Sequence, residues 1–373
     1  MKSTSLIRRA CLCGLCGLAI GALVASVLAL TPLPAGYPGA YDKTISGAQR
    51  EGRVVVYSAT ELHAARPLLQ DFKALHPGVV VEYHHMSSAE VNRRYLAESV
   101  AGTGSADVLW SPAMDLQMKL VNDGHALAYK SPESEHLPPW AVWRHEAYGT
   151  TFEPVVFVYN RRLLKPAEVP QTHAGLLRAL REQGTLLKGK VATYDIERVG
   201  VGFLLATQDS RTTPAFWQLA DAMFASGAQV HTTTGMMMER IASGEALLGY
   251  NLLGSYVVAR AKVDPSIGYV LPSDYTLVMS RILFISKRAK NTNAAKLWLD
   301  YILSQRGQRI IANESMLFSL RSDVQGEATA SALIKELGDS IKPIAVGPGL
   351  LIYLDRTKQV EFMRRWRQSR DAR

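Results

Sequence analysis

The chain has 373 residues, enough for two globular lobes or one large α/β domain with a substantial core. Hydrophobic residues make up 47% of it and charged residues 20%, so the composition excludes a largely disordered chain. Its net charge of +9 favours an anionic ligand or an anionic membrane surface. The sequence has no helix-turn-helix, zinc or aromatic RNA-binding motif, and we therefore expect no nucleic-acid partner.

The first thirty residues are predicted to be a targeting segment. Three basic residues precede an apolar, uncharged run over residues 10–30, which is the pattern of a signal peptide. Small residues at Ala29, Ala35 or Ala40 suit cleavage, although the run is also long enough to remain as an N-terminal membrane anchor. Either outcome exports the rest of the chain, and we therefore predict a periplasmic protein.

All three cysteines, Cys11, Cys13 and Cys16, belong to this segment. A cleaved protein would contain no thiol, which excludes disulfides, cysteine catalysis and thiolate-bound metal. Cleavage would also remove three of the nine net positive charges and leave a moderately basic protein.

Residues 41–152 alternate short apolar strands with amphipathic helices and are predicted to form the first part of one lobe. Strands are expected over residues 53–57, 79–83 and 107–110, each followed by a helix. This rhythm predicts parallel strands, whose carboxyl ends carry the ligand site in an open α/β sheet. The polar residues at these ends are candidates for ligand binding or, alternatively, helix caps: Ser58, Thr60 and Ser111.

Residues 148–160 have the pattern of long strands interrupted at Pro154, where we expect the backbone to cross at a hinge into a second lobe over residues 153–272. Hydroxyls and peptide N–H groups at helix starts would favour an anionic ligand there. The acidic and amide residues would accept hydrogen bonds from sugar hydroxyls, pair with an ammonium group, or simply form turns. An arginine, Arg198 or Arg281, would pair with a phosphate or carboxylate. The candidate ligand-binding residues here and in the following turn are Tyr194, Asp195, Thr232, Thr233, Thr234, Asn251 and Asp274.

Residues 273–320 contain a predicted strand at residues 280–285 and are expected to return to the first lobe. Residues 321–373 are predicted to form C-terminal helices that pack mainly on the second lobe. The arginines of the last, basic helix are interpreted as a solvated face. Its expected buried residues are Val360, Phe362, Met363 and Trp366.

Short motifs follow one another between residues 50 and 320. They are RVVVYS at 53–58, ADVLWS at 106–111, VVFVYN at 155–160, SGE at 243–245, and AAKLW at 294–298 with LSQRGQ at 303–308. In this order and spacing they resemble the extracellular solute-binding proteins of ABC importers, in the branch that contains ferric-iron and phosphosugar binding proteins.

This resemblance implies a type II periplasmic binding protein fold, in which two α/β lobes joined by a hinge enclose a cleft. The cleft closes on a small-molecule ligand, and the protein then docks on an ABC permease in the cytoplasmic membrane. A sensor kinase is the alternative partner, because some relatives present their ligand to one. We expect a monomer without a cofactor.

The ferric-iron alternative within this family depends on particular residues. Ferric-iron binders of the family place a histidine shortly after the first strand and two adjacent tyrosines after a later strand. The corresponding positions here are Glu61 and Leu252-Leu253. The expected ligand is therefore an organic or phosphorylated anion, with ferric iron as the alternative.

Other motifs in the sequence give little support for metal binding or catalysis. The adjacent residues His84 and His85 would point to opposite faces of a strand, and the run Met236-Met237-Met238 would spread around a helix. No G-x-S-x-G, H-E-x-x-H or P-loop motif is present, so we predict no metal site and no enzymatic activity. An exported two-lobed enzyme of the transferase type is the alternative from another functional class.

Overall fold

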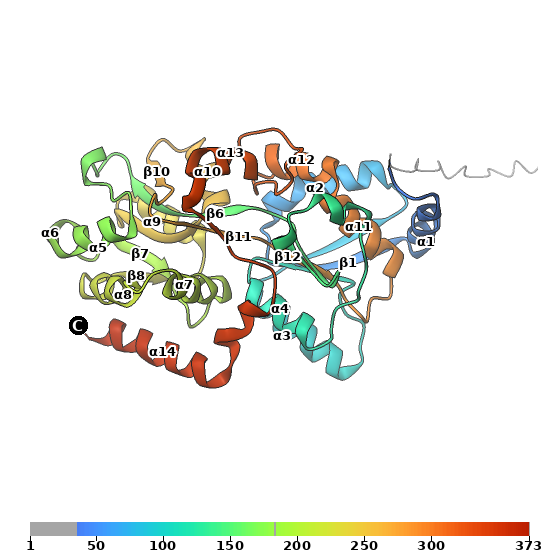
Figure 1. Cartoon of the computed structure of the whole chain (residues 1–373), viewed down its shortest axis with the longest axis horizontal. Helices are drawn as coiled ribbons and strands as arrows, with labels where there is room; N and C mark the ends of the chain where they lie inside the picture. Colours follow the sequence, from blue (N-terminus) through green and yellow to red (C-terminus); the bar gives the residue numbers. More distant parts are fainter. Residues whose placement is uncertain (1–35, 183, 373) are drawn as a thin grey trace, which may run out of the picture. The chain divides into compact units, whose positions relative to one another are not determined.

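The computed structural model describes residues 36–182 and 184–372 (Figure 1). The predicted targeting segment and its cysteines lie outside the described residues. The predicted α/β fold is confirmed, because two separate mixed sheets are flanked by helices. Within the described part of the chain, no helix is both long enough and apolar enough to cross a membrane.

The first sheet has six strands, and the three at one side, β2, β1 and β3, are parallel as predicted. The strand β1 pairs in parallel with both β2 and β3, whereas β12 runs antiparallel between β3 and β5. In spatial order the strands are β2 (Val80–His85), β1 (Arg53–Ser58), β3 (Val108–Ser111), β12 (Ile282–Ile285), β5 (Ala147–Gly149) and β4 (Val142–Trp143).

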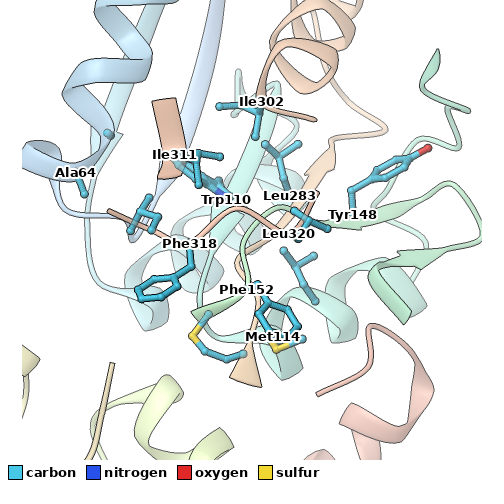
Figure 2. Packing of buried hydrophobic residues seen from close by; sticks show 14 of the residues in the cluster. Ala64, Trp110, Met114, Tyr148, Phe152, Leu283, Ile302, Ile311, Phe318 and Leu320 are labelled. Atoms are coloured by element: carbon cyan, nitrogen blue, oxygen red, sulfur yellow. The ribbon is translucent and has the colours of Figure 1, made fainter. Parts of the chain in front are cut away.

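The helices around the first sheet enclose a hydrophobic core that contains several aromatic side chains. Trp110 on β3 is fully buried, and Figure 2 shows it in one cluster with Phe152, Leu283 and Phe318. The helices are α1 (Asp42–Glu51), α2 (Leu62–Leu75), α3 (Ser88–Ala101), α4 (Met114–Asn122), α11 (Thr292–Leu303) and α12 (Gln305–Asn313). Short 3-10 helices are η1 (Gly39–Tyr41), η2 (Pro132–His136) and η3 (Pro139–Ala141).

The second sheet has seven strands and is also mixed. Its strand β7 pairs in parallel with β8 and β9, and the long strand β6 runs antiparallel to β9, β10 and β11. In spatial order the strands are β13 (Ile341–Pro343), β11 (Thr276–Met279), β6 (Glu153–Asn160), β9 (Leu248–Leu253), β7 (Val191–Tyr194) and β8 (Gln229–His231), with β10 (Ile267–Val270) on β6.

The helices that accompany this sheet include the C-terminal one. They are α5 (His173–Glu182), α6 (Gly184–Leu187), α7 (Gly200–Thr212), α8 (Phe216–Ala225), α9 (Thr234–Ser243), α10 (Gly254–Ala261), α13 (Ala330–Leu337) and α14 (Arg356–Asp371). Short 3-10 helices are η4 (Pro166–Glu168), η5 (Gly338–Ser340) and η6 (Pro348–Leu354).

The last helix, α14, packs on α8 (Figure 1). Aromatic side chains of both helices meet at this contact. Phe362 and Trp366 are buried against the aromatic residues of α8, as predicted. The prediction for Val360 is wrong, since its side chain is 59% exposed. Two helical residues of separation place Val360 about 200° around the axis from Phe362, whereas Phe362 and Trp366 share one face.

Besides a later return between β12 and β13, the backbone passes from one sheet to the other at residues 150–152, between β5 and β6, and at residues 280–281, between β11 and β12. These two segments are hydrogen-bonded to each other, with the Thr150 amide donating to the Arg281 carbonyl at 3.0 Å. The Arg281 guanidinium also forms two hydrogen bonds to the Glu153 carboxylate, at 2.7 and 2.9 Å, and both side chains are fully buried. A buried ion pair therefore lies at the point where the chain changes sheets.

Candidate functional site

A cleft of about 740 Å³ lies between segments that belong to the first sheet with its helices and segments that belong to the second sheet with its helices. The segments that follow β1 and β2 form one wall, and the segments around the end of β7 and the starts of α7, α9 and α10 form the other. The lining residues are Ala59, Glu61, Leu62, His63, His85, Met86, Ser87, Ser88, Ala89, Pro112, Tyr194, Arg198, Val199, Gly200, Val201, Thr232, Thr233, Thr234, Leu253 and Tyr256.

Four helices begin at this cleft. Leu62, Ser88, Gly200 and Thr234 are the first residues of α2, α3, α7 and α9, and all four line it. The first amide groups of a helix have no acceptor within the helix, and the helix dipole places partial positive charge at the same end. The cleft is therefore surrounded by peptide N–H donors that favour a negatively charged group.

These helices differ in whether a side chain caps their first amide groups. The Ser87 hydroxyl accepts the Glu90 amide at 3.3 Å, and the Glu90 carboxylate accepts the Ser87 amide at 2.9 Å, which forms a capping box on α3. The Thr233 hydroxyl accepts the Met236 amide of α9 at 3.1 Å. The helices α2 and α7 have no side-chain cap. Their first amide groups are therefore the more open to a ligand.

Glycines allow α7 to approach its neighbours closely. A Cβ atom added at Gly202 would lie 2.5 Å from the Cβ atom of Tyr194, and one added at Gly200 would lie 3.0 Å from a methyl group of Leu116. Real Cβ atoms do not approach other atoms to 2.5 Å, so Gly202 permits the contact between α7 and β7. This contact holds the start of α7 beside Tyr194 at the cleft.

Four of the predicted site residues line the cleft together: Tyr194, Thr232, Thr233 and Thr234. The Tyr194 hydroxyl is hydrogen-bonded to the Thr234 hydroxyl, which joins the end of β7 to the start of α9. Burial raises the pKa of Tyr194, so its phenol stays protonated at neutral pH. It can therefore offer a hydroxyl rather than a phenolate to a ligand.

Three other predicted residues are buried directly behind the cleft wall. The Ser58 hydroxyl accepts the Thr60 amide at 3.0 Å, and the Thr60 hydroxyl accepts an Arg281 N–H at 3.1 Å. The Ser111 hydroxyl donates to that of Ser88 at 3.1 Å and accepts the Ala113 amide at 3.2 Å. These hydroxyls support the loops that follow β1 and β3 and are not among the lining groups.

The last three predicted residues are held by contacts elsewhere. The Asp195 carboxylate accepts the Glu197 amide at 3.1 Å in a turn. The Asn251 side-chain amide donates to the buried carboxylate of Asp209. The Asp274 carboxylate accepts the His173 amide at 2.8 Å and lies 2.9 Å from Nδ1 of the same histidine. None of the three lines the cleft.

Of the two arginines predicted as alternative partners of an anionic ligand, one lines the cleft and the other does not. Arg198 lines the cleft and is exposed. Arg281 is engaged by Glu153 and fully buried, so the interpretation of Arg281 as a ligand partner is wrong. The guanidinium of Arg281 instead lies 5.1 Å from the ring centre of Tyr256, which forms part of the cleft wall.

Several lining residues were not predicted, above all Glu61, His63, Ser87 and Ser88. The capping box from Ser87 to Glu90 directly after a strand is the sequence signal that could have revealed the start of α3. Glu61 follows the first strand and lines the cleft, with its carboxylate 3.3 Å from Nδ1 of His63. Across residues 36–182 and 184–372, no three His, Cys, Asp or Glu side chains are arranged to hold a metal ion.

The sequence profile described as "Bacterial extracellular solute-binding protein" matches residues 68–336. A comparison with curated proteins found no match. Among solved structures, the substrate-binding protein of an ABC transporter from Agrobacterium tumefaciens is 38% identical, with a TM-score of 0.82, over 88% of this chain and 96% of that one.

Two further structures share the fold at low identity. The periplasmic binding protein AfuA from Actinobacillus pleuropneumoniae, with bound fructose-6-phosphate, is 17% identical over 86% of this chain and 99% of that one, with a TM-score of 0.71. Iron-bound HitA from Pseudomonas aeruginosa is 15% identical over 85% and 99%, with a TM-score of 0.65. The predicted family is confirmed, and the chain belongs to the bacterial extracellular solute-binding proteins of ABC transporters.

Proposed function

We propose that this protein is the periplasmic binding component of an ABC importer and captures a small anionic solute, organic or phosphorylated, in the cleft described above. The observation that carries the proposal is the convergence of four helix starts on one cleft. The N-terminal segment would direct export as a signal peptide or remain as an anchor. The two hydrogen-bonded crossing segments, residues 150–152 and 280–281, would act as the hinge between the lobes.

The chemistry of the cleft suits an anion that must be bound and released. Peptide N–H groups and hydroxyls stabilise negative charge without burying additional ionised side chains, so little desolvation opposes binding. A cleft of about 740 Å³ has room for an organic molecule, not only for a single ion. The phosphosugar bound by AfuA, a protein of the same fold, supports a phosphorylated solute as one possibility.

Ferric iron is a second candidate, since HitA of the same fold is iron-bound and two tyrosines, Tyr194 and Tyr256, line the cleft. Iron would need phenolate ligands, however, and the Tyr194 hydroxyl is already hydrogen-bonded to the Thr234 hydroxyl. The Tyr256 hydroxyl also accepts the Glu61 amide at 3.3 Å. These contacts favour the organic anion over iron.

The test of the proposed function is native mass spectrometry of the exported protein as purified, followed by release and identification of any bound molecule. A stoichiometric phosphate or carboxylate, recovered chemically unchanged, would support a binding protein for that class. Bound iron would support the second candidate, and a converted product would support an enzyme. For an empty protein, small-angle scattering across a metabolite set should show compaction with at least one anion, and no compaction at all would contradict the proposal.

Replacing the cleft arginine should weaken binding. We expect Arg198→Gln to lower the affinity for the anionic solute by about tenfold or more, because a guanidinium forms charge-assisted hydrogen bonds that an amide cannot replace. Isothermal titration calorimetry measures the change. Arg178→Gln, at an exposed arginine of α5 outside the cleft, is the matched control and should bind as the unaltered protein does. Equal affinities for the two variants would exclude Arg198 from the site.

A further inference from the structure

The cleft carries charges of both signs. Among its lining residues, Arg198 supplies a guanidinium and Glu61 a carboxylate, and the remaining ionisable groups are two histidines and two tyrosines. The formal charges of Arg198 and Glu61 cancel when the histidines are neutral. The four helix starts then add partial positive charge from the backbone. The site therefore offers one centre for a cation within surroundings that otherwise favour an anion.

The carboxylate of Glu61 lies at the cleft surface and has no lysine or arginine partner within the described ranges. Its backbone amide is fixed by the Tyr256 hydroxyl, and its side chain lines the cleft with 39% of its surface exposed. Within the described ranges its ion-pair partner is His63, and no lysine or arginine lies within ion-pair distance of Glu61. His63 itself is 65% exposed, so the carboxylate remains accessible from the cleft.

A carboxylate in this position opposes the binding of a purely anionic solute. Closure of a cleft removes water, and an unpaired charge then costs far more than it does in solution. A ligand hydroxyl would form a hydrogen bond with Glu61 but would leave its charge uncompensated. An ammonium group would do both, because it donates hydrogen bonds and neutralises the carboxylate.

We propose that the transported solute is a zwitterion, whose anionic group is held by the helix starts and Arg198 and whose ammonium group is held by the carboxylate of Glu61. This inference rests on the proposed function, because it concerns the ligand of the same cleft. It excludes phosphosugars and other purely anionic molecules as preferred ligands. A dipolar ligand would also match a cleft whose own side-chain charges sum to zero.

The test compares molecules that differ only in the amine. Phosphoethanolamine is paired with ethyl phosphate, and 5-aminopentanoate with pentanoate, and each is titrated by calorimetry into the exported protein. We expect the amine-bearing member of at least one pair to bind about tenfold or more tightly than its partner. Glu61→Gln should abolish this preference, because the neutral amide cannot neutralise ammonium, and should leave the binding of the amine-free partner equal or stronger.

Two control variants separate Glu61 from its surroundings. His63→Gln removes the neighbouring ring and should keep the preference for the amine. Glu239→Gln removes an exposed carboxylate of α9 that does not line the cleft and should behave as the unaltered protein. Far-ultraviolet circular dichroism and thermal unfolding of each variant show whether it is folded.

The outcomes also distinguish this inference from the proposed function. Tighter binding of the amine-free member of the pairs would overturn the zwitterion proposal. Tighter binding of the amine-bearing member that persists in Glu61→Gln would overturn it as well. The same conclusion holds if neither amine-bearing probe binds at millimolar concentration while an amine-free solute compacts the protein; the proposed function would then stand. Absence of compaction with every solute would remove both proposals.

Discussion

Glu153→Gln should lower the free energy of unfolding by about 3–5 kcal/mol, because it leaves the buried guanidinium of Arg281 without its counter-charge. Both side chains are fully buried, and Glu153 also accepts hydrogen bonds from the hydroxyls of Thr151 and Ser255. Burial opposes the charge on Arg281, and the adjacent carboxylate of Glu153 restores it and raises the pKa of Arg281. A guanidinium has so high a pKa in water that Arg281 keeps its charge even in the variant, without the carboxylate. Chemical denaturation monitored by fluorescence measures the loss.

A surface pair is the matched control for this prediction. Arg53 and Glu82 lie 3.1 Å apart, with side chains 56% and 37% exposed, so Arg53→Gln should cost less than about 1 kcal/mol. The double variant Glu153→Leu with Arg281→Met should recover part of the stability, because neither charge then remains buried. Equal losses for Glu153→Gln and Arg53→Gln would show that the buried pair contributes no more than a surface pair.

The local pattern of the sequence is sufficient to predict the parallel strands of the first sheet. The runs of β-branched residues at 53–57 and 79–83 form β1 and β2, and the parallel pairing follows from the intervening helix. The carboxyl ends of β1, β3 and β7 adjoin the cleft or its supporting loops, as the general rule for open α/β sheets requires. The location of the site could therefore be predicted, because it depends on topology.

The orientation of single polar side chains could not be predicted in the same way. A hydroxyl at the end of a strand can face a ligand or accept a hydrogen bond from the amide two residues further along the chain, and Ser58 and Ser111 do the latter. Asn251 and Asp274 bond to Asp209 and His173, which lie 42 and 101 residues away in the sequence. Such partners are determined by the packing of distant elements. Glu61 differs from these residues, because the family pattern predicts a histidine at its position and therefore gives no signal for a carboxylate there.

The buried carboxyl of Asp115, on α4, should make the stability of the protein depend on pH. Its side chain has no partner in another residue's side chain within the described ranges, and Oδ1 accepts only the amide of Leu116, at 2.9 Å. Burial raises the pKa of Asp115 from 3.8 to about 7. The folded state therefore keeps its proton at pH values at which the unfolded state has lost it, and stability falls as the pH rises from about 4 to about 7.

Asp115→Asn removes this ionisation and keeps the acceptor for the Leu116 amide. Its free energy of unfolding should equal that of the unaltered protein near pH 4, and should exceed it by about 2–4 kcal/mol near pH 8, where the burial of the carboxylate has its full cost. Denaturant titrations between pH 4 and pH 8 measure the difference. Asp123→Asn, at the exposed end of the same helix, should show no comparable increase with pH. A difference between Asp115→Asn and the unaltered protein that stays constant from pH 4 to pH 8 would mean that Asp115 ionises in the folded state as it does in water.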